Sequence, residues 1–149
     1  MKLTAKKPSY SFTRKDTVVV FLTENHAKNP SGLYPAGLEP LVKRANTALI
    51  RGKTGETAFI PLGDAPVLIF AGLGKREDVT PETLRNSAAA VAELCKKKKI
   101  GTLNLFVPLL EKPAPKETVR SLAEGLCLAN YLFNHYKSRA DDASRLVET

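Results

Sequence analysis

Pro66-Val-Leu-Ile-Phe-Ala71 is the clearest strand pattern in this chain, and it decides the fold class. Its residues are apolar throughout, so the pattern predicts a central strand covered on both faces by helices. Gly72-Leu-Gly-Lys75 follows as a tight strand exit. Thr80 and Pro81 then predict a helix start, because threonine is a good N-cap residue and proline suits the first helical position.

The rest of the chain continues this alternation of strands and helices. Before residue 66 the sequence predicts an edge strand over 9–13, a buried strand over 17–23, a loop over 24–37, a helix over 38–50 and a strand near an edge over 56–62. After residue 80 it predicts a helix from Pro81 to about Lys98 that Gly101 ends, a strand over 102–107, and a last helix from about Lys116 to Ser138. This order predicts an α/β fold with a mostly parallel or mixed sheet and helices on both faces.

The two long helices carry apolar residues at the spacing of one buried face. The predicted buried positions are Leu84, Ala88, Val91, Leu94 and Cys95 in the first, and Val119, Leu122, Leu126, Ala129, Phe133 and Tyr136 in the second. Cys95 and Cys127 both fall in these helices, where a free cysteine behaves as a small hydrophobic residue. We predict buried thiols, with a disulfide as the alternative.

Composition indicates a single domain of ordinary size. Of 149 residues, 43% are hydrophobic, which is enough to build a core. No apolar run approaches the roughly 18 residues that span a bilayer, and the N-terminus does not have the pattern of a signal peptide. We therefore expect a cytoplasmic protein without membrane contact.

The net charge of +8 is compatible with an acidic partner such as nucleic acid. The densest basic run, Lys96 to Lys99, lies at the end of a predicted helix, where cations complement the helix dipole. We favour that structural role over a nucleic-acid patch, since a basic run alone is a weak motif.

Two glycine-containing segments resemble phosphate loops without meeting their requirements. Gly52-Lys-Thr54 lacks the earlier glycine of a Walker A motif, because that position is Thr47, and a helix precedes it instead of a strand. Gly72-Leu-Gly74 follows a strand, but Glu77 replaces the third glycine of a dinucleotide fingerprint. Both segments are predicted to be structural.

No catalytic constellation is evident. His26 and His135 have no partner at metal-ligand spacing, and Asp141-Asp142 is predicted to be a solvated pair in the tail. Cys95 precedes the lysine run and would be mildly activated if exposed, although core packing is the favoured interpretation. We therefore assign no catalytic, cofactor-binding or metal-ligating residue to this chain.

Several segments in order resemble the N-terminal domain of the leucyl aminopeptidase (cytosol aminopeptidase) family. They are Gly52-Lys-Thr-Gly-Glu56, Val67-Leu-Ile-Phe-Ala-Gly-Leu-Gly-Lys75, Thr80 with Leu84-Arg85 and Ser87-Ala-Ala-Ala-Val-Ala92, and Ala123-Glu-Gly-Leu-Cys-Leu-Ala-Asn-Tyr131 with Phe133 and Tyr136-Lys-Ser138. The resemblance covers about residues 17–138.

The resemblance implies a macro-domain-like, three-layer α/β/α fold at residues 1–138, with 139–149 as the start of a linker. It also implies a parent aminopeptidase, usually a hexamer, whose two divalent metals (zinc or manganese) and Asn-Thr-Asp-Ala-Glu-Gly-Arg signature belong to a C-terminal catalytic domain. This chain has no such run. We expect it to pack on that domain, to support assembly and to shape access to the active site.

Two other functions stay open at this point. Some bacterial family members bind DNA with participation of this domain, and the charge permits a nucleic-acid-binding accessory role. A macro-type module that binds a nucleotide ligand is the other alternative, and it rests on fold analogy alone.

Overall fold

A computed structural model describes residues 12–28, 34, 37–45, 50–64, 66–107 and 110–131. In chain order these residues form β1 (Thr17–Leu22), α1 (Glu24–Lys28), α2 (Glu39–Ala45), β2 (Thr57–Ile60), β3 (Val67–Gly72), the 3-10 turn η2 (Arg76–Asp78), α3 (Pro81–Lys98), β4 (Asn104–Phe106) and α4 (Pro115–Asn130). The alternation of strands and helices confirms the predicted α/β class.

The four strands form one mixed sheet in the order β2-β3-β1-β4. β1 is parallel to both β3 and β4, whereas β2 is antiparallel to β3. The central strands β1 and β3 are buried on both faces along nearly their whole length, which explains why both read as unbroken apolar runs. β2 lies at an edge and is followed by Pro61, as predicted.

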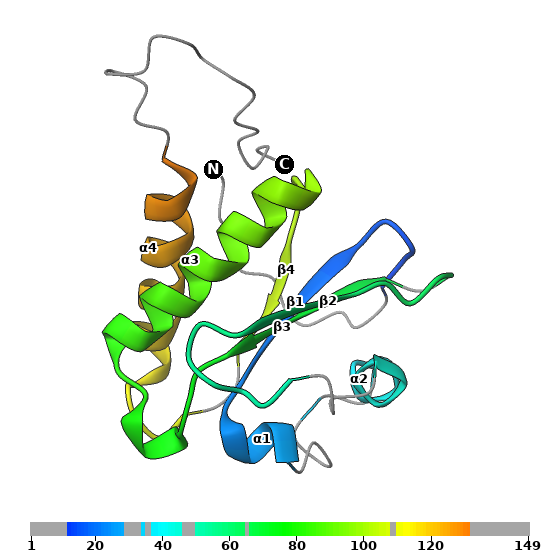
Figure 1. Ribbon diagram of the computed structural model, residues 1–149. Coiled ribbons are helices and arrows are strands. Elements are labelled where there is room, and N and C mark those ends of the chain that lie inside the picture. Colours follow the sequence, from blue (N-terminus) through cyan, green and yellow to red (C-terminus); the bar gives the residue numbers. More distant parts are fainter. Residues whose placement is uncertain are drawn as a thin grey trace, which may run out of the picture.

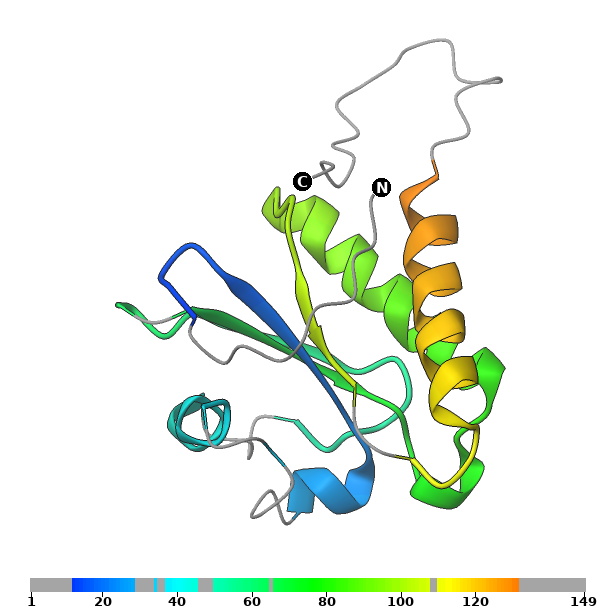
Figure 2. The same cartoon turned by 180° about the vertical axis from the view of Figure 1, so that it is seen from behind.

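Helices cover both faces of this sheet. α3 and α4 lie on one face, and α1 and α2 lie on the other (Figures 1 and 2). Alternate residues of β1 enter the two cores: Val19 and Phe21 face the α3 side, and Val18, Val20 and Leu22 face the α2 side. The arrangement confirms three layers, with a helical layer on each side of the sheet.

α3 begins at the predicted cap and ends at Lys98, as predicted, but the residue that terminates it differs from the prediction. Thr83 N donates to Thr80 Oγ1 at 3.2 Å, and Thr80 N donates to Thr83 Oγ1 at 3.4 Å. At the other end Lys99 adopts a left-handed conformation (φ 56°, ψ 40°), and Ile100 N donates to Cys95 O at 2.9 Å. The prediction that Gly101 ends the helix is therefore wrong, because a lysine takes the left-handed position that glycine usually fills.

α4 ends at Asn130, short of the predicted Ser138, and Tyr131 is already extended (φ −69°, ψ 127°). Leu122 and Leu126 are buried as predicted. Val119 is 54% exposed, so its predicted burial is wrong. The physical reason is that α4 packs chiefly against α3. A single neighbouring helix covers a narrower strip of the α4 surface than a helix and a sheet together would cover.

Other predictions are corrected or lie outside the described residues. The predicted loop over 24–37 contains the short helix α1, and the predicted helix over 38–50 is α2, which is over before Ile50. Leu94 is half-buried rather than buried. Residues 1–11, 46–49 and 132–149 lie outside the described part, and with them most of the predicted edge strand, His135, Asp141, Asp142 and the domain boundary after residue 138.

Candidate functional site

The carboxyl edge of the sheet is the usual ligand site of an α/β fold. Ligands bind there where neighbouring strands send their connections to opposite faces. β1 and β3 are such neighbours, because β1 leads into α1 on one face and β3 leads through η2 into α3 on the other (Figure 1). The crevice between their ends is therefore the first place where a binding site is expected.

The chain's own loop over residues 51–56 fills this crevice. Gly74 N donates to Gly52 O at 2.7 Å, and Gly72 N donates to Glu56 O at 2.8 Å. A Cβ atom on Gly72 would lie 2.0 Å from Lys53 O, and one on Gly52 would lie 2.7 Å from Thr23 O. The glycines thus let two stretches of backbone approach to contact distance, and the crevice is occupied by protein.

The two segments that resemble phosphate loops face each other across this contact. Their amides are used within the fold: Leu73 N donates to Leu22 O at 2.8 Å, and Lys53 N donates to the Glu56 carboxylate at 3.1 Å. An anion site needs such amides to point at the ligand. The structure therefore gives both segments the structural role that was predicted, and adds that they form one unit, which the sequence did not indicate.

His26 lies beside the same edge, in the middle of α1. Thr23 N donates to His26 Nδ1, and His26 N donates to Thr23 Oγ1, both at 3.4 Å. Burial lowers the pKa of His26, and the nearby positive charge of Arg76 lowers it further. The ring is therefore neutral near pH 7, and its role is to close the turn between β1 and α1.

The two cysteines differ. Cys95 is buried in α3, and burial raises the pKa of its thiol to about 11, so it is an inert thiol at neutral pH. Cys127 is exposed on α4, so its predicted burial is wrong. Apolar residues occupy both sides of α4, and the sequence periodicity did not tell which side faces α3.

Metal ligation was not predicted for any residue of this chain. Among the described residues, no three His, Cys, Asp or Glu side chains gather closely enough to hold one ion. The described residues therefore do not fit a two-metal centre.

The basic run at the end of α3 is partly engaged inside the fold. Lys96 Nζ contacts the Glu93 carboxylate at 3.0 Å and also donates to Ala129 O near the end of α4. Lys98 Nζ lies 4.8 Å from the centroid of the Phe59 ring. The predicted placement in the last helical turn is confirmed, and two of the four lysines already have partners in the chain.

The outer face of α4 carries exposed apolar side chains. Val119, Leu128 and Tyr131 are 54%, 70% and 71% exposed, and they are the large hydrophobic residues that lie exposed in the described part of the chain. Beside them is a shallow hollow of about 490 Å³, lined by Arg120, Ala123, Glu124, Cys127 and Leu128. Exposed apolar patches of this kind mark contact surfaces.

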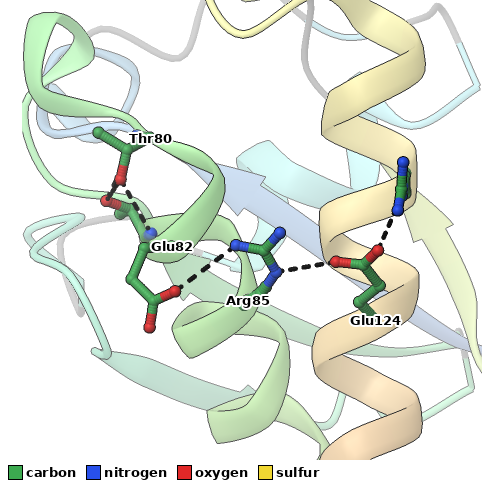
Figure 3. A network of polar contacts seen from close by, with 6 residues as sticks. Thr80, Glu82, Arg85 and Glu124 are labelled. Atoms are coloured by element: carbon green, nitrogen blue, oxygen red, sulfur yellow. Dashed lines mark hydrogen bonds and ion pairs between the residues drawn. The ribbon is translucent and has the colours of Figure 1, made fainter.

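An ion-pair network borders this face (Figure 3). Glu124 bridges two helices, because Arg120 Nε and Arg85 Nε each donate to its carboxylate at 2.8 Å. Arg85 also lies 3.5 Å from the Glu82 carboxylate. The hydrogen bond from Arg120, followed by that from Arg85, holds the pKa of Glu124 below its usual value. The charges of these four side chains cancel.

Comparison with known proteins now assigns the chain. Residues 19–140 match the model of the cytosol aminopeptidase family, N-terminal domain. The chain belongs to this family. The match confirms the resemblance on which the sequence analysis relied, and it places the chain at the N-terminal domain of cytosol aminopeptidases.

Curated relatives are considerably longer. The probable cytosol aminopeptidase of Aquifex aeolicus (strain VF5) is 30% identical over 145 residues, which is 95% of this chain and 29% of the relative. That of Gloeothece citriformis (strain PCC 7424) is 41% identical over 100 residues, or 65% of this chain and 20% of the relative. This chain therefore spans less than a third of the length of these cytosol aminopeptidases.

Solved structures share the fold. The bottromycin maturation enzyme BotP superposes with a TM-score of 0.59 at 24% identity, over 90% of this chain and 27% of BotP. BotP in complex with Mn gives a TM-score of 0.56 at 23% identity, over 83% of this chain and 25% of that one. These similarities show a common fold. Within the described residues, no helix is both long and apolar enough to span a membrane.

Proposed function

We propose that this chain is the non-catalytic N-terminal domain of a larger metal-dependent aminopeptidase, which releases N-terminal amino acids from peptides. The observation that carries the proposal is the family match over residues 19–140, combined with the small share of each relative that the chain spans. The two divalent metals, zinc or manganese, then belong to the remaining part of the parent protein, the C-terminal catalytic domain.

The role of the domain in this proposal is support. It packs on the catalytic domain, contributes to a homo-oligomer such as a hexamer, and shapes the path of peptides to the active site. Two observations support such a role: the chain's own backbone fills the crevice where an α/β domain would bind a small molecule, and an apolar helix face is open for contact.

The test compares the 149-residue chain with the full-length product of its gene. We expect the reading frame to continue past Thr149 and the full-length product to hydrolyse leucine p-nitroanilide with added zinc or manganese, whereas the 149-residue chain does not. Hydrolysis by the 149-residue chain alone would place the chemistry inside it and overturn the proposal. A stop codon after Thr149 would also count against it.

Nucleic-acid binding is a second candidate, which the net charge of +8 and the exposed Lys97 and Lys99 favour. A protein that binds through phosphate contacts loses affinity steeply as salt increases, by about 10³ or more between 50 and 200 mM when several phosphates are contacted. Fluorescence anisotropy with a labelled DNA duplex across this range measures the slope. A flat salt dependence, or no binding at low salt, would remove this candidate.

A macro-type nucleotide-binding module is the remaining alternative. The filled crevice between β1 and β3 argues against it, because a ligand at that edge would have to displace backbone that is hydrogen-bonded at 2.7–2.8 Å. Calorimetric titration with ADP-ribose tests it, and binding heat would revive it.

A further inference from the structure

We propose that the outer face of α4, formed by Val119, Ala123, Cys127, Leu128 and Tyr131, is the surface on which the remainder of the parent polypeptide docks. This inference rests on the proposed function, since the occupant is the part of the parent that lies outside this chain. It goes further by naming the helix face, the residues and the kind of contact.

α4 is divided into two faces. Its inner face is committed to α3: Leu122 and Leu126 are 1% and 2% exposed, and a Cβ atom on Gly125 would lie 2.3 Å from Arg85 O. The outer residues project to the opposite side, where the described chain places no further layer (Figure 2). Exposed apolar side chains on a face that no described layer covers are typical of a contact surface.

The charged side chains on the outer face of α4 are already paired. Arg120 and Glu124 line the hollow, but they are paired with each other at 2.8 Å, and Glu124 is also paired with Arg85. Burying a charge is costly when it lacks a partner. Because these side chains already satisfy one another, an apolar surface can cover them without having to supply opposite charges.

The size of the outer face favours a segment of the same polypeptide over a second copy of the chain. A separate copy of the chain would need to bury about 1,200–2,000 Å² in total to form a stable dimer, and one short helix face offers few exposed apolar residues for this. A segment of the same polypeptide is held at millimolar effective concentration by its linker, so a smaller patch suffices. The relatives supply such a segment, because more than two thirds of the A. aeolicus protein lies outside the match.

The experiment uses Cys127 as a reporter on the face and Cys95 as an internal standard for folding. Iodoacetamide alkylation is followed by peptide mass spectrometry in the 149-residue chain and in the full-length gene product. We expect Cys127 to react about tenfold or more slowly in the full-length product, which corresponds to a docking free energy of about 1.4 kcal/mol or more. Cys95 should stay unreactive in both proteins while they are folded.

Two variants of the full-length product sharpen the test. Leu128→Glu places a charge in the contact and should restore most of the Cys127 reactivity. Asn86→Glu adds the same charge at an exposed position of α3 and should leave Cys127 protected. Because both positions are exposed in this domain, neither change should expose Cys95.

The outcomes separate the two proposals. A full-length product with peptidase activity whose Cys127 reacts as fast as in the 149-residue chain overturns the docking face and leaves the proposed function standing. A full-length product without peptidase activity overturns the proposed function, whatever the reactivity of Cys127. A third outcome is that the 149-residue chain forms a dimer in sedimentation runs, that Leu128→Glu abolishes the dimer, and that Cys127 is unprotected in the full-length product. This outcome assigns the face to a second copy of the chain and overturns docking.

Discussion

The carboxyl edge of the sheet and the outer face of α4 are opposite in character. At the carboxyl edge, where α/β domains usually bind ligands, the backbone of residues 51–56 packs against Gly72 so closely that a Cβ atom does not fit. On the outer face of α4, apolar side chains such as Leu128 stand in solvent. The difference teaches that the described part of the domain packs its own backbone into the usual ligand site and leaves apolar side chains uncovered on the outer face of α4.

The largest expected effect is that of a substitution at Gly72, at the carboxyl edge of the sheet. In Gly72→Ala the new Cβ atom would lie 2.0 Å from Lys53 O, which is backbone and cannot turn aside. We expect a loss of about 3 kcal/mol or more in the free energy of unfolding, measured by urea denaturation.

Gly55→Ala is the matched control at the same loop. Gly55 has a φ of +78° but no atom within 4 Å of the new Cβ. The free energy of unfolding of Gly55→Ala should therefore fall only by the cost of placing a side chain in the left-handed conformation, about 1–2 kcal/mol. Equal losses in the two variants would show that the contact at Gly72 is not what closes the edge.

The two faces of α4 should respond differently to small changes. Gly125→Ala drives a methyl group against Arg85 O, 2.3 Å away, and should cost about 1–3 kcal/mol through overpacking between α3 and α4. Leu128→Ala on the outer face removes a larger group, yet should change the free energy of unfolding by only about 0.5 kcal/mol or less. Chemical denaturation of the 149-residue chain measures both, and a larger loss for Leu128→Ala would contradict the assignment of faces.

His26, beside the carboxyl edge of the sheet, should make the free energy of unfolding depend on pH. The pKa of His26 is lowered from 6.5 in the folded state by burial and Arg76, so the unfolded state binds a proton more readily. The stabilisation is present above pH 6.5 and is lost as pH falls through the folded-state pKa. We expect a smaller change than for either clash above, measured as the slope of unfolding free energy between pH 7 and about 5.

The His26→Gln variant removes the titrating group and should flatten this part of the profile. If the slope between these pH values is unchanged in His26→Gln, another group causes it.

The smallest expected effect on stability is that of Glu124, beside the outer face of α4. Arg120 and Arg85 hold the pKa of Glu124 below its ordinary 4.5, so its contribution to stability is present above pH 4.5 and is lost as pH falls through the folded-state value. Glu124→Gln should lower the urea midpoint slightly at pH 7 and not at about pH 3, and added salt should reduce the difference. Glu77→Gln, at an exposed position of η2, is the control for the loss of one surface negative charge.

The sheet was the part of the fold that the sequence predicted well. β1 and β3 were found because a strand covered on both faces must be apolar at consecutive positions, and β2 because Pro61 limits it to an edge. α1 was missed, because its five residues, Glu24–Lys28, are too few to show a helical period. Lys99 was missed as a helix end, because a left-handed lysine has no sequence signal.

The candidate surface was not predicted, for a physical reason. Periodicity finds apolar residues on a helix but not the neighbour that covers them. For α4 it selected Leu122 and Leu126 correctly, yet it also placed Val119 and Cys127 in the core. The sequence did contain a sign of this surface. Leu128 and Tyr131 are apolar, but they lie outside the buried stripe that contains Leu122 and Leu126, so α4 carries apolar residues on a second side.

The parallel pairing of β1 with β3 also determines when this domain can assemble during synthesis. β1 leaves the ribosome first, but both of its partners, β3 and β4, are made after α1, α2 and β2. Native pairs that are distant in sequence form late. The apolar residues Val18–Leu22 therefore lack their strand neighbours until translation has passed Gly72, and an unpaired apolar strand of this kind is prone to aggregate.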